Sequence, residues 1–492
     1  MRKTSPSSSF PAILVPYGHL PSTPNGDGLL TGTSGPSSPP APQRGLLRAL
    51  GLHRKELRAW AMYDWANSAF ATTVMAAVLP IYYVQVAGDT IPSNVALAYW
   101  GYTASIALII IVAISPVLGA VADYVGAKKT FLAAFMVLGV AATFGLSFVG
   151  PGEWIGASVF YILGNIGFTG SIVFYASLLP HIASDSELDR VAAGGWAVGY
   201  VGGGLLLVIN AAMLIRPDLF GLADQAAASR AAFASVAAWW ALFSVPLFRH
   251  VAEPPRRIDP TEEGLAMNPV AAGLHRLGQT FGEIREYRQL VLFLAAFFFY
   301  TDGIGTIIKM ATAYGSQIGI GTEDLIGALL VVQFVGIPFT FAFGALADRI
   351  GAKNGILIAL GVYAGISVFG YFVEEAWHFW VLAFAVGTVQ GGAQSLSRGL
   401  FASIIPRARS SEFFAFFSVF EKAAGILGPI LFGFASQATG TGRFGILAVV
   451  FFFLAGIVIL RRVDVDEARR VARKEDAEME RVEGLPPPTP AS

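Results

Sequence analysis

The sequence predicts an all-α membrane protein with twelve transmembrane helices in two parallel six-helix pseudo-repeats. Three observations predict this fold class: an apolar composition, apolar runs separated by short polar joints, and an internal repeat. Apolar residues make up 54% of the chain and charged residues only 13%, whereas soluble proteins are roughly a quarter charged. A membrane span takes about 20 apolar residues, so a chain of 492 residues has room for about twelve spans.

The charge balance and the absence of cysteine exclude several other classes of protein. The 33 Lys and Arg residues equal the 33 Asp and Glu residues in number, which argues against a nucleic-acid binder with a basic surface. The chain has no Cys, so it has no disulfide, no thiolate metal site and no thiol nucleophile. We expect no nucleic-acid partner, no metal and no cofactor.

The first element is a tail. Residues 1–56 are mostly rich in Ser, Pro and Gly and are predicted to form a disordered cytoplasmic tail. The apolar stretch that begins near Phe10 is interrupted by Pro11 and Pro16, so it is too short for a signal peptide. A transit peptide and a misplaced start codon are the alternatives.

Two six-helix bundles follow, at 57–248 and 289–462. Each predicted span is an apolar run of membrane length between polar joints. The predicted spans are 59–86, 96–121, 130–149, 155–180, 194–215, 231–248, 289–313, 323–346, 355–373, 378–404, 412–435 and 443–460.

Two segments outside the bundles are predicted to lie on the cytoplasmic side. The linker 249–288 carries Leu274, Leu277 and Phe281 at helical spacing, which predicts an amphipathic helix on the lipid headgroups. Residues 463–492 form a charged cytoplasmic tail, predicted to be solvated and helical in its first part. Docking of a partner on this tail is the alternative.

The orientation follows from the positive charges, which are retained on the cytoplasmic side. One set of joints holds Lys128, Lys129 and Lys353 together with the Arg-rich linker 249–288. The opposite set holds only Arg residues at span edges. Both termini are therefore predicted to be cytoplasmic.

The two halves of the chain repeat each other. The joint after the second span reads GAVADYVGAKK from Gly119 to Lys129, and the joint after the eighth reads GALADRIGAKN from Gly344 to Asn354. A second pair of segments, YASLLP from Tyr175 and FASIIP from Phe401, lies at nearly the same spacing. Matching joints follow equivalent spans, so the halves are parallel repeats.

These joints, with their G-x-x-x-D-x-x-G-x-K/R pattern, resemble the signature of the major facilitator superfamily, whose halves are related in this way. Three further motifs are similar to the vacuole-effluxer-like branch, which includes the fungal autophagy-related amino-acid effluxers: YDWANSAF (Tyr63 to Phe70), YTDGIGT (Tyr300 to Thr306) and GGAQSLSR (Gly391 to Arg398). The resemblance covers about 57–460. It implies the major facilitator fold and a secondary transporter, with amino acids as a candidate substrate class.

The repeated joints supply the candidate gating residues, which are Gly119, Asp123, Gly126, Lys128, Lys129, Gly344, Asp348, Gly351 and Lys353. A carboxylate complements the positive end of a helix, so Asp123 is expected to dock on the start of the eleventh span and Asp348 on the start of the fifth. These contacts would lock an outward-open state. The glycines permit a tight turn, and the lysines are expected to anchor to anionic headgroups. The alternative is that the joints only set the topology.

Polar residues inside the spans supply the candidates for substrate or ion handling, because charges at lipid depth are costly and usually face a cavity or a partner. These candidates are Asp64 and Asn67 in the first span, Asp302 and Thr306 in the seventh, Gln390, Gln394 and Arg398 in the tenth, and Glu421 and Lys422 in the eleventh. The resemblance implies that the first, fourth, seventh and tenth spans line a central cavity. For each charge, an ion pair within a bundle is the alternative.

Spacing refines three of these candidates. Asp302 and Lys309 are about 10 Å apart along a helix, which is too far for a tight salt bridge. Gln390, Gln394 and Arg398 recur every four residues and predict a polar stripe. Glu421 stands where the resembled branch usually has a small residue, so it belongs either to a shared mechanism or to a local ion pair with Arg398.

The sequence therefore predicts a secondary active transporter of a small polar solute, amino acids among them, that works by alternating access. It predicts no enzyme and no ATP-driven pump, because the chain lacks zinc-protease, nucleophile-elbow and Walker motifs. Proton coupling through Asp64 or Asp302 is a hypothesis. We expect a monomer in the bacterial cell (inner) membrane, in contact with lipids. A drug exporter, a non-transporting scaffold and an intramembrane enzyme are the alternatives.

Overall fold

The computed structural model describes residues 47, 50–124, 128–184, 187–253, 287–406, 413, 417 and 420–483. Within these ranges, the side chains at 115–124, 180, 188–190, 193, 337, 341, 348 and 478–483 lie outside the description. The chain divides into two units, 1–44 and 45–492, and the helices described below belong to the second. Most of the predicted tail and of the linker 249–288, with its amphipathic helix, lies outside the described residues.

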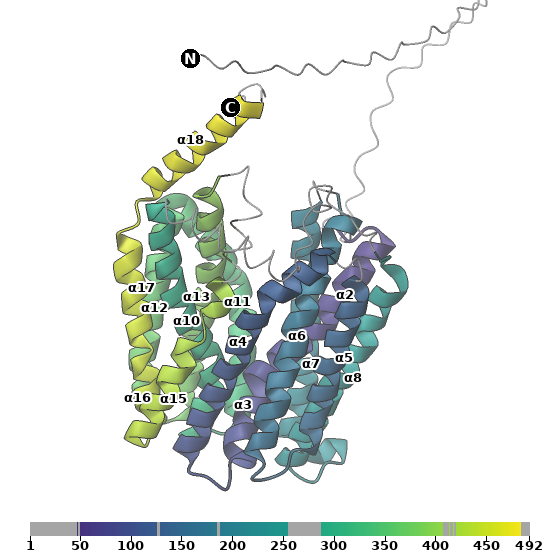
Figure 1. The fold of residues 1–492 in the computed structure, drawn as a ribbon. Coiled ribbons are helices and arrows are strands. Elements are labelled where there is room, and N and C mark those ends of the chain that lie inside the picture. Colours follow the sequence, from purple (N-terminus) through teal and green to yellow (C-terminus); the bar gives the residue numbers. More distant parts are fainter. Residues whose placement is uncertain are drawn as a thin grey trace, which may run out of the picture. The chain divides into compact units, whose positions relative to one another are not determined.

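The first predicted span is a composite helix made of α2, η1, α3 and η2, and five further helices complete the N-terminal half (Figure 1). The elements are α2 (Lys55–Ala69), η1 (Phe70–Val78), α3 (Leu79–Tyr82), η2 (Tyr83–Ala87), α4 (Ser93–Tyr124), α5 (Lys128–Gly145), η3 (Leu146–Phe148), α6 (Trp154–Ile182), α7 (Leu188–Ile215), η4 (Pro217–Phe220) and α8 (Gln225–His250). Both η1 and η2 are π-helical, a geometry that is rare and often found at functional sites.

The C-terminal half holds the elements α10 to α17, and α18 follows it (Figure 1). The elements are α10 (Arg288–Gln317), α11 (Thr322–Ile350), α12 (Ala352–Tyr371), α13 (Ala376–Ser403), α15 (Leu427–Thr439), α16 (Gly442–Ala448), α17 (Val450–Arg461) and α18 (Val465–Glu483). The described residues of both halves form helices joined by short turns and include no strand, and the all-α fold class is confirmed.

Ten helices within the described ranges are long and apolar enough to cross a membrane. The two other predicted spans are 378–404 and 412–435. The first corresponds to α13, which has 28 residues but carries the polar stripe that lowers its apolarity. The second differs from a continuous span: the chain is helical at 420–423, turns at 424–426 and resumes as α15, which has only 13 residues.

A glycine is the physical reason for this interruption. Gly425 has a φ of 107°, a backbone conformation that is open to glycine but strained for residues with a Cβ. The eleventh span, predicted at 412–435, is therefore a discontinuous helix in its described part.

Hydrogen bonds between the two halves gather at one end of the bundle. Trp100 on α4 donates to the carbonyl of Lys309 on α10 at 2.9 Å, and Tyr102 donates to Gln437 on α15 at 3.1 Å. These contacts lie towards the start of α4 and the end of α15, whereas α18 follows the opposite end of α17. The halves are thus clasped on the side away from α18.

Two chain segments predicted as tails pack on the bundle in part. Leu52 is buried, and Arg54 pairs with Glu187 at 3.0 Å at the start of α7, so α2 begins earlier than predicted. The predicted disorder is therefore wrong for residues 50–56. At the other end, Gln289 donates to Glu467 of α18, and Ala468 and Ala472 are buried. The charged helix is present as predicted, but one of its faces is docked rather than solvated.

Candidate functional site

The polar stripe of α13 faces α7 of the other half. The guanidinium carbon of Arg398 lies 5.5 Å from the centre of the Trp196 ring on α7, within the range of a cation–π contact. Deeper in the bundle, Gln390 on α13 and Leu207 on α7 line the same cavity. Because residues four apart share a helix face, Gln394 lies between these two contacts on its own stripe. The two helices therefore approach each other at the Arg398–Trp196 contact and again at the cavity.

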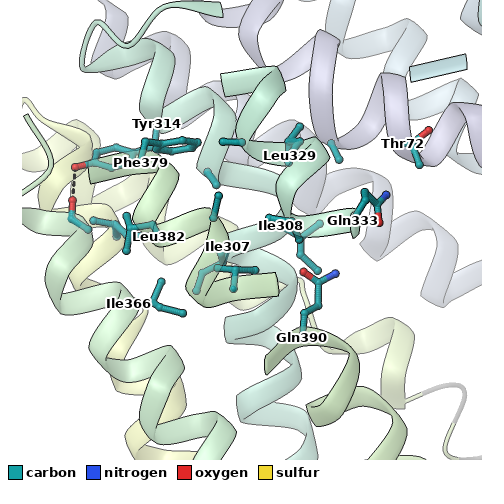
Figure 2. A pocket seen from close by; sticks show the side chains of 18 of the residues that line it. Thr72, Ile307, Ile308, Tyr314, Leu329, Gln333, Ile366, Phe379, Leu382 and Gln390 are labelled. Atoms are coloured by element: carbon teal, nitrogen blue, oxygen red, sulfur yellow. Dashed lines mark hydrogen bonds between the residues drawn. The ribbon is translucent and has the colours of Figure 1, made fainter. Parts of the chain in front are cut away.

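The cavity has a volume of about 120 Å³. Figure 2 shows Gln333 of α11 and Gln390 of α13 near each other at one edge of its lining, with Thr72 of η1 beyond them. Apolar side chains make up most of the rest of the wall, among them Ile307, Ile308, Leu329, Ile366, Phe379 and Leu382. Such a wall with a few polar groups is typical of a small-molecule site. Of the predicted substrate residues, only Gln390 lines it.

Asp302 lies on another face of α10 and is fully buried. Its carboxylate accepts hydrogen bonds from the backbone N–H groups of Leu427, at 3.1 Å, and Gly428, at 2.8 Å. Thr306 is also buried and donates to the carbonyl of Asp302 at 2.7 Å. The carboxylate thus caps the start of α15, where the helix N-terminus favours a negative charge.

Asp64 is held inside the N-terminal half. The hydroxyl of Tyr175 on α6 donates to Asp64 Oδ2 at 2.8 Å, and the Tyr175 ring stacks on Trp60 at 4.4 Å. A Cβ at Gly195 would lie 2.7 Å from Asp64 Oδ2, so α7 approaches closely because that residue is glycine. Asn67, one turn further, is buried, and its Nδ2 atom has no hydrogen-bond partner within the described part of the chain.

The charges near the break in the eleventh span form a local pair. Arg398 Nη2 lies 2.8 Å from Glu421 Oε1, with the two side chains 48% and 37% exposed. This is the ion pair that was the alternative for Glu421. The neighbouring Lys422 is half-buried and, one residue along, leaves the helix in another direction. Together with Trp196, the pair links three helices from both halves.

The lysines of the repeated joints bind protein carbonyls rather than pointing only towards headgroups. Lys129 Nζ donates to the carbonyls of Phe248 and Val251 at 3.0 and 2.6 Å, at the end of α8. Lys353 Nζ donates in the same way at the end of α17, to the carbonyls of Arg461 at 3.0 Å and Val463 at 2.7 Å. A lysine complements the negative end of a helix. The lipid-anchor expectation is therefore corrected for these two residues.

Lys128 makes a different contact: its ammonium donates to the carbonyl of Ser177 at 3.3 Å and lies 3.1 Å from His181 Nε2. The sequence repeat aligns Lys128 with Lys353, whereas the contacts make Lys129 the counterpart of Lys353. The repeat is thus present in space with a shift of one residue, which no alignment of the two joints predicts.

The remaining gating candidates are described only in part. Gly351 separates α11 from α12 and has a φ of 84°, so this turn needs a glycine. A Cβ on Gly344 would meet no described atom within 4 Å, so close packing does not explain that glycine. Gly119 lies within α4. The side chains of Asp123 and Asp348, and the residue Gly126, lie outside the described part, and the docking of the two carboxylates stays a prediction.

Sequence reasoning missed the partners that join the halves. Ser105 of α4 donates to the carbonyl of Ile426 at 2.9 Å, and Thr312 of α10 donates to the carbonyl of Ala76 in η1 at 2.9 Å. Both hydroxyls sit in apolar runs, where a lone Ser or Thr commonly bonds its own helix. Their sequence context therefore held no signal of an inter-half bond.

Comparisons with known proteins fit this geometry. Residues 91–473 match the family described as "Vacuole effluxer Atg22 like". The "Uncharacterized MFS-type transporter YxiO" of Bacillus subtilis (strain 168) is 38% identical over 86% of this chain and 98% of its own length. "Autophagy-related protein 22" of Coccidioides immitis (strain RS) is 23% identical over 86% of this chain and 88% of its own length.

Solved structures share the fold at low sequence identity. A mutant form of the nucleoside transporter NupG has a TM-score of 0.60 at 14% identity, over 84% of this chain and 98% of its own. The D-xylose-proton symporter has a TM-score of 0.57 at 14% identity, over 82% of this chain and 96% of its own. Two facing helical halves with a cavity between them thus define an integral, multi-pass membrane protein of the major facilitator fold.

The particular family follows from the sequence matches. The chain belongs to the vacuole effluxer Atg22-like family, as the motifs of the first, seventh and tenth spans predict.

Proposed function

We propose that this protein is a secondary active transporter that moves a small polar solute by alternating access, with neutral amino acids as the substrate class. The observation that carries the proposal is the cavity that residues of both halves line, among them Leu207 on α7 and Gln390 on α13. A second contact joins the same two helices, where the Arg398 guanidinium lies over the Trp196 ring. A cavity between two halves that are clasped at one end supports alternating access.

The chemistry of the cavity supports a solute with an apolar body and a few hydrogen-bonding groups. The amides of Gln333 and Gln390 can each donate and accept, and Thr72 also lines the cavity. Asp64 and Asp302 already accept bonds from protein donors. The amides, rather than the carboxylates, are therefore the proposed contacts of the solute in this conformation, with Arg398 meeting a solute carboxylate at the mouth.

Proton coupling through Asp64 or Asp302 is part of the proposal, and both carboxylates are held by bonds that protonation would weaken. Uptake driven by a pH gradient into proteoliposomes tests it. Asp64→Asn or Asp302→Asn should abolish the dependence on the gradient, and unchanged uptake by both variants would remove the coupling hypothesis. We further propose a monomer in the bacterial cell (inner) membrane with both termini in the cytoplasm, since Lys and Arg gather on that side.

Counterflow in proteoliposomes tests transport directly. Vesicles loaded with one unlabelled amino acid at a time should accumulate the same labelled amino acid, and Gln390→Leu should raise its KM by about 2- to 10-fold, the usual effect of one lost hydrogen bond. Gln394→Leu is the matched control, because Gln394 does not line the cavity. Absence of counterflow with every amino acid would refute the substrate class.

The apolar wall of the cavity favours one second candidate, an exporter of lipophilic drugs. Efflux of ethidium from energised vesicles distinguishes the two: the proposal expects none. Ethidium efflux without amino-acid counterflow would assign the protein to drug export instead.

A further inference from the structure

The break in the eleventh span has backbone groups that are bound by side chains of other helices. A break in a membrane helix frees N–H and C=O groups, and there is no water in the lipid to bind them. Between 425 and 428, two N–H groups bind Asp302 of α10, and the carbonyl of Gly425 accepts from Lys309 of α10 at 3.5 Å. The carbonyl of Ile426 accepts from Ser105 of α4 at 2.9 Å.

These partners differ in one respect that matters for transport. Asp302 and Lys309 belong to the same half as the break, so their bonds persist when the halves move as bodies. Ser105 belongs to the other half. When the halves separate on this side, the carbonyl of Ile426 must exchange Ser105 for water or another donor.

Two glycines bring the three helices close enough for this arrangement. A Cβ at Gly428 would lie 2.7 Å from Asp302 Oδ1, and a Cβ at Gly101 of α4 would lie 2.6 Å from the carbonyl oxygen of Pro429. Both distances are shorter than atoms tolerate. The backbone of the break is thus packed directly on α10 on one side and on α4 on the other.

We propose that the ionised Asp302 is a positioning residue that holds the broken eleventh span on α10 while the two halves move, and that Ser105 makes the separable contact of the N-terminal half with that break. The proposal rests on transport by alternating access. It differs from a substrate-binding role for Asp302, whose side chain is fully buried and whose two oxygens each accept a backbone N–H.

The natural absence of cysteine permits a direct test on the full chain. Spin labels on pairs of introduced cysteines report distances in lipid nanodiscs without any substrate. Val291→Cys on α10 with Phe434→Cys on α15 reports on geometry within the C-terminal half. Phe148→Cys with Phe434→Cys reports on the separation of the halves at their clasped end. All three residues are exposed.

Asp302→Asn removes one acceptor from the break and places an NH₂ group against an N–H donor. The 291–434 distance distribution should broaden into more than one component. Asp302→Glu, which keeps both acceptor oxygens, should give a shifted but single distance. An unchanged 291–434 distribution in both variants would overturn the positioning role.

Ser105→Ala should leave the 291–434 distance unchanged and shift the 148–434 population towards the separated state by about 2- to 10-fold. Thr103→Ala is the matched control on the same helix, because Thr103 bonds Ser158 within its own half at 2.9 Å, and it should shift nothing. Equal effects of Ser105→Ala and Thr103→Ala would refute the role of Ser105 as the separable contact between the halves. Counterflow is measured separately, so failure of this proposal and failure of the proposed function are distinguishable.

Discussion

The contact between Arg398 and Trp196 predicts how strongly the two halves are held together at the end where α7 begins. Glu421 holds Arg398 at 2.8 Å, and the guanidinium carbon lies 5.5 Å from the Trp196 ring of the other half. Of these two contacts, the cation–π contact is the one that joins the halves, so it is the one that differs between open and closed states. At a partly exposed site such a contact contributes about 0.5–1 kcal/mol, which corresponds to about a 2- to 5-fold change in population.

Trp196→Leu should therefore shift the equilibrium towards the state that is open at this end by about 2- to 5-fold. The measurement uses spin labels at Arg249→Cys, at the end of α8, and Arg462→Cys, just beyond α17, in the cysteine-free chain. Trp377→Leu is the matched control, because Trp377 bonds Glu375 within its own helix start. It should leave the distances unchanged.

Glu421→Gln supplies the decisive comparison. Because Glu421 orients Arg398, the effect of Trp196→Leu should be smaller in the Glu421→Gln background, and the two substitutions should not be additive. Strict additivity, or no shift with Trp196→Leu alone, would refute the reasoning that this contact acts as a gate.

Three further predictions concern single contacts. Tyr175→Phe removes the donor to Asp64 and should lower the free energy of unfolding by about 1.5–3 kcal/mol, the range for bonds to charged groups, measured by thermal unfolding of the detergent-solubilised protein. Lys129→Met and Lys353→Met each remove a helix C-terminal contact and should each cost about 0.3–1 kcal/mol in the same measurement. Hydrogen bonds from Ser184, with the Arg54 charge, hold the pKa of Glu187 below its usual range. Docking of residues 50–56 should therefore be complete above the usual Glu pKa and be lost as the pH falls through the lowered pKa. Hydrogen exchange of residues 50–56 as a function of pH measures this loss.

Each of these predictions has a control in the chain. Tyr200→Phe alters an exposed tyrosine and should not change the unfolding temperature. Lys55 lies at the N-terminal end of α2 rather than at a helix C-terminus, so Lys55→Met should not destabilise the protein by the dipole effect. Glu187→Gln should make the exchange of residues 50–56 independent of pH in the acid range. A wild-type response in Tyr175→Phe, or a pH response that persists in Glu187→Gln, would contradict the assigned contacts.

Much of the fold was predictable because lipid imposes a simple rule: every backbone polar group in a span must be satisfied within the protein, so apolar runs of membrane length become helices. The repeated joints around Asp123 and Asp348 predicted that the two halves are parallel repeats. The motifs near Tyr63 and Tyr300 predicted the family, which the comparisons confirm.

The site was predictable only where one helix decides it. The spacing of Gln390, Gln394 and Arg398 places them on one face whatever surrounds α13, and Gln390 does line the cavity. Asp302 was recognised as unusual because a charge at lipid depth needs a partner. Its partners, the N–H groups of Leu427 and Gly428, lie more than a hundred residues further along the chain.

The sequence by itself thus determined that the helices lie in lipid, where the helices are, that the two halves repeat each other, and which polar residues need partners. Only the tertiary structure decided which partners they found. Trp196 meets Arg398, Ser105 meets Ile426 and Lys129 meets the end of α8 because helices distant in sequence pack side by side. Periodicity specifies the face of a helix but not which helix packs against that face. A turn such as the one at Gly425 leaves backbone N–H and C=O groups free to bond to another helix, and side-chain identities do not predict which residue will bind them.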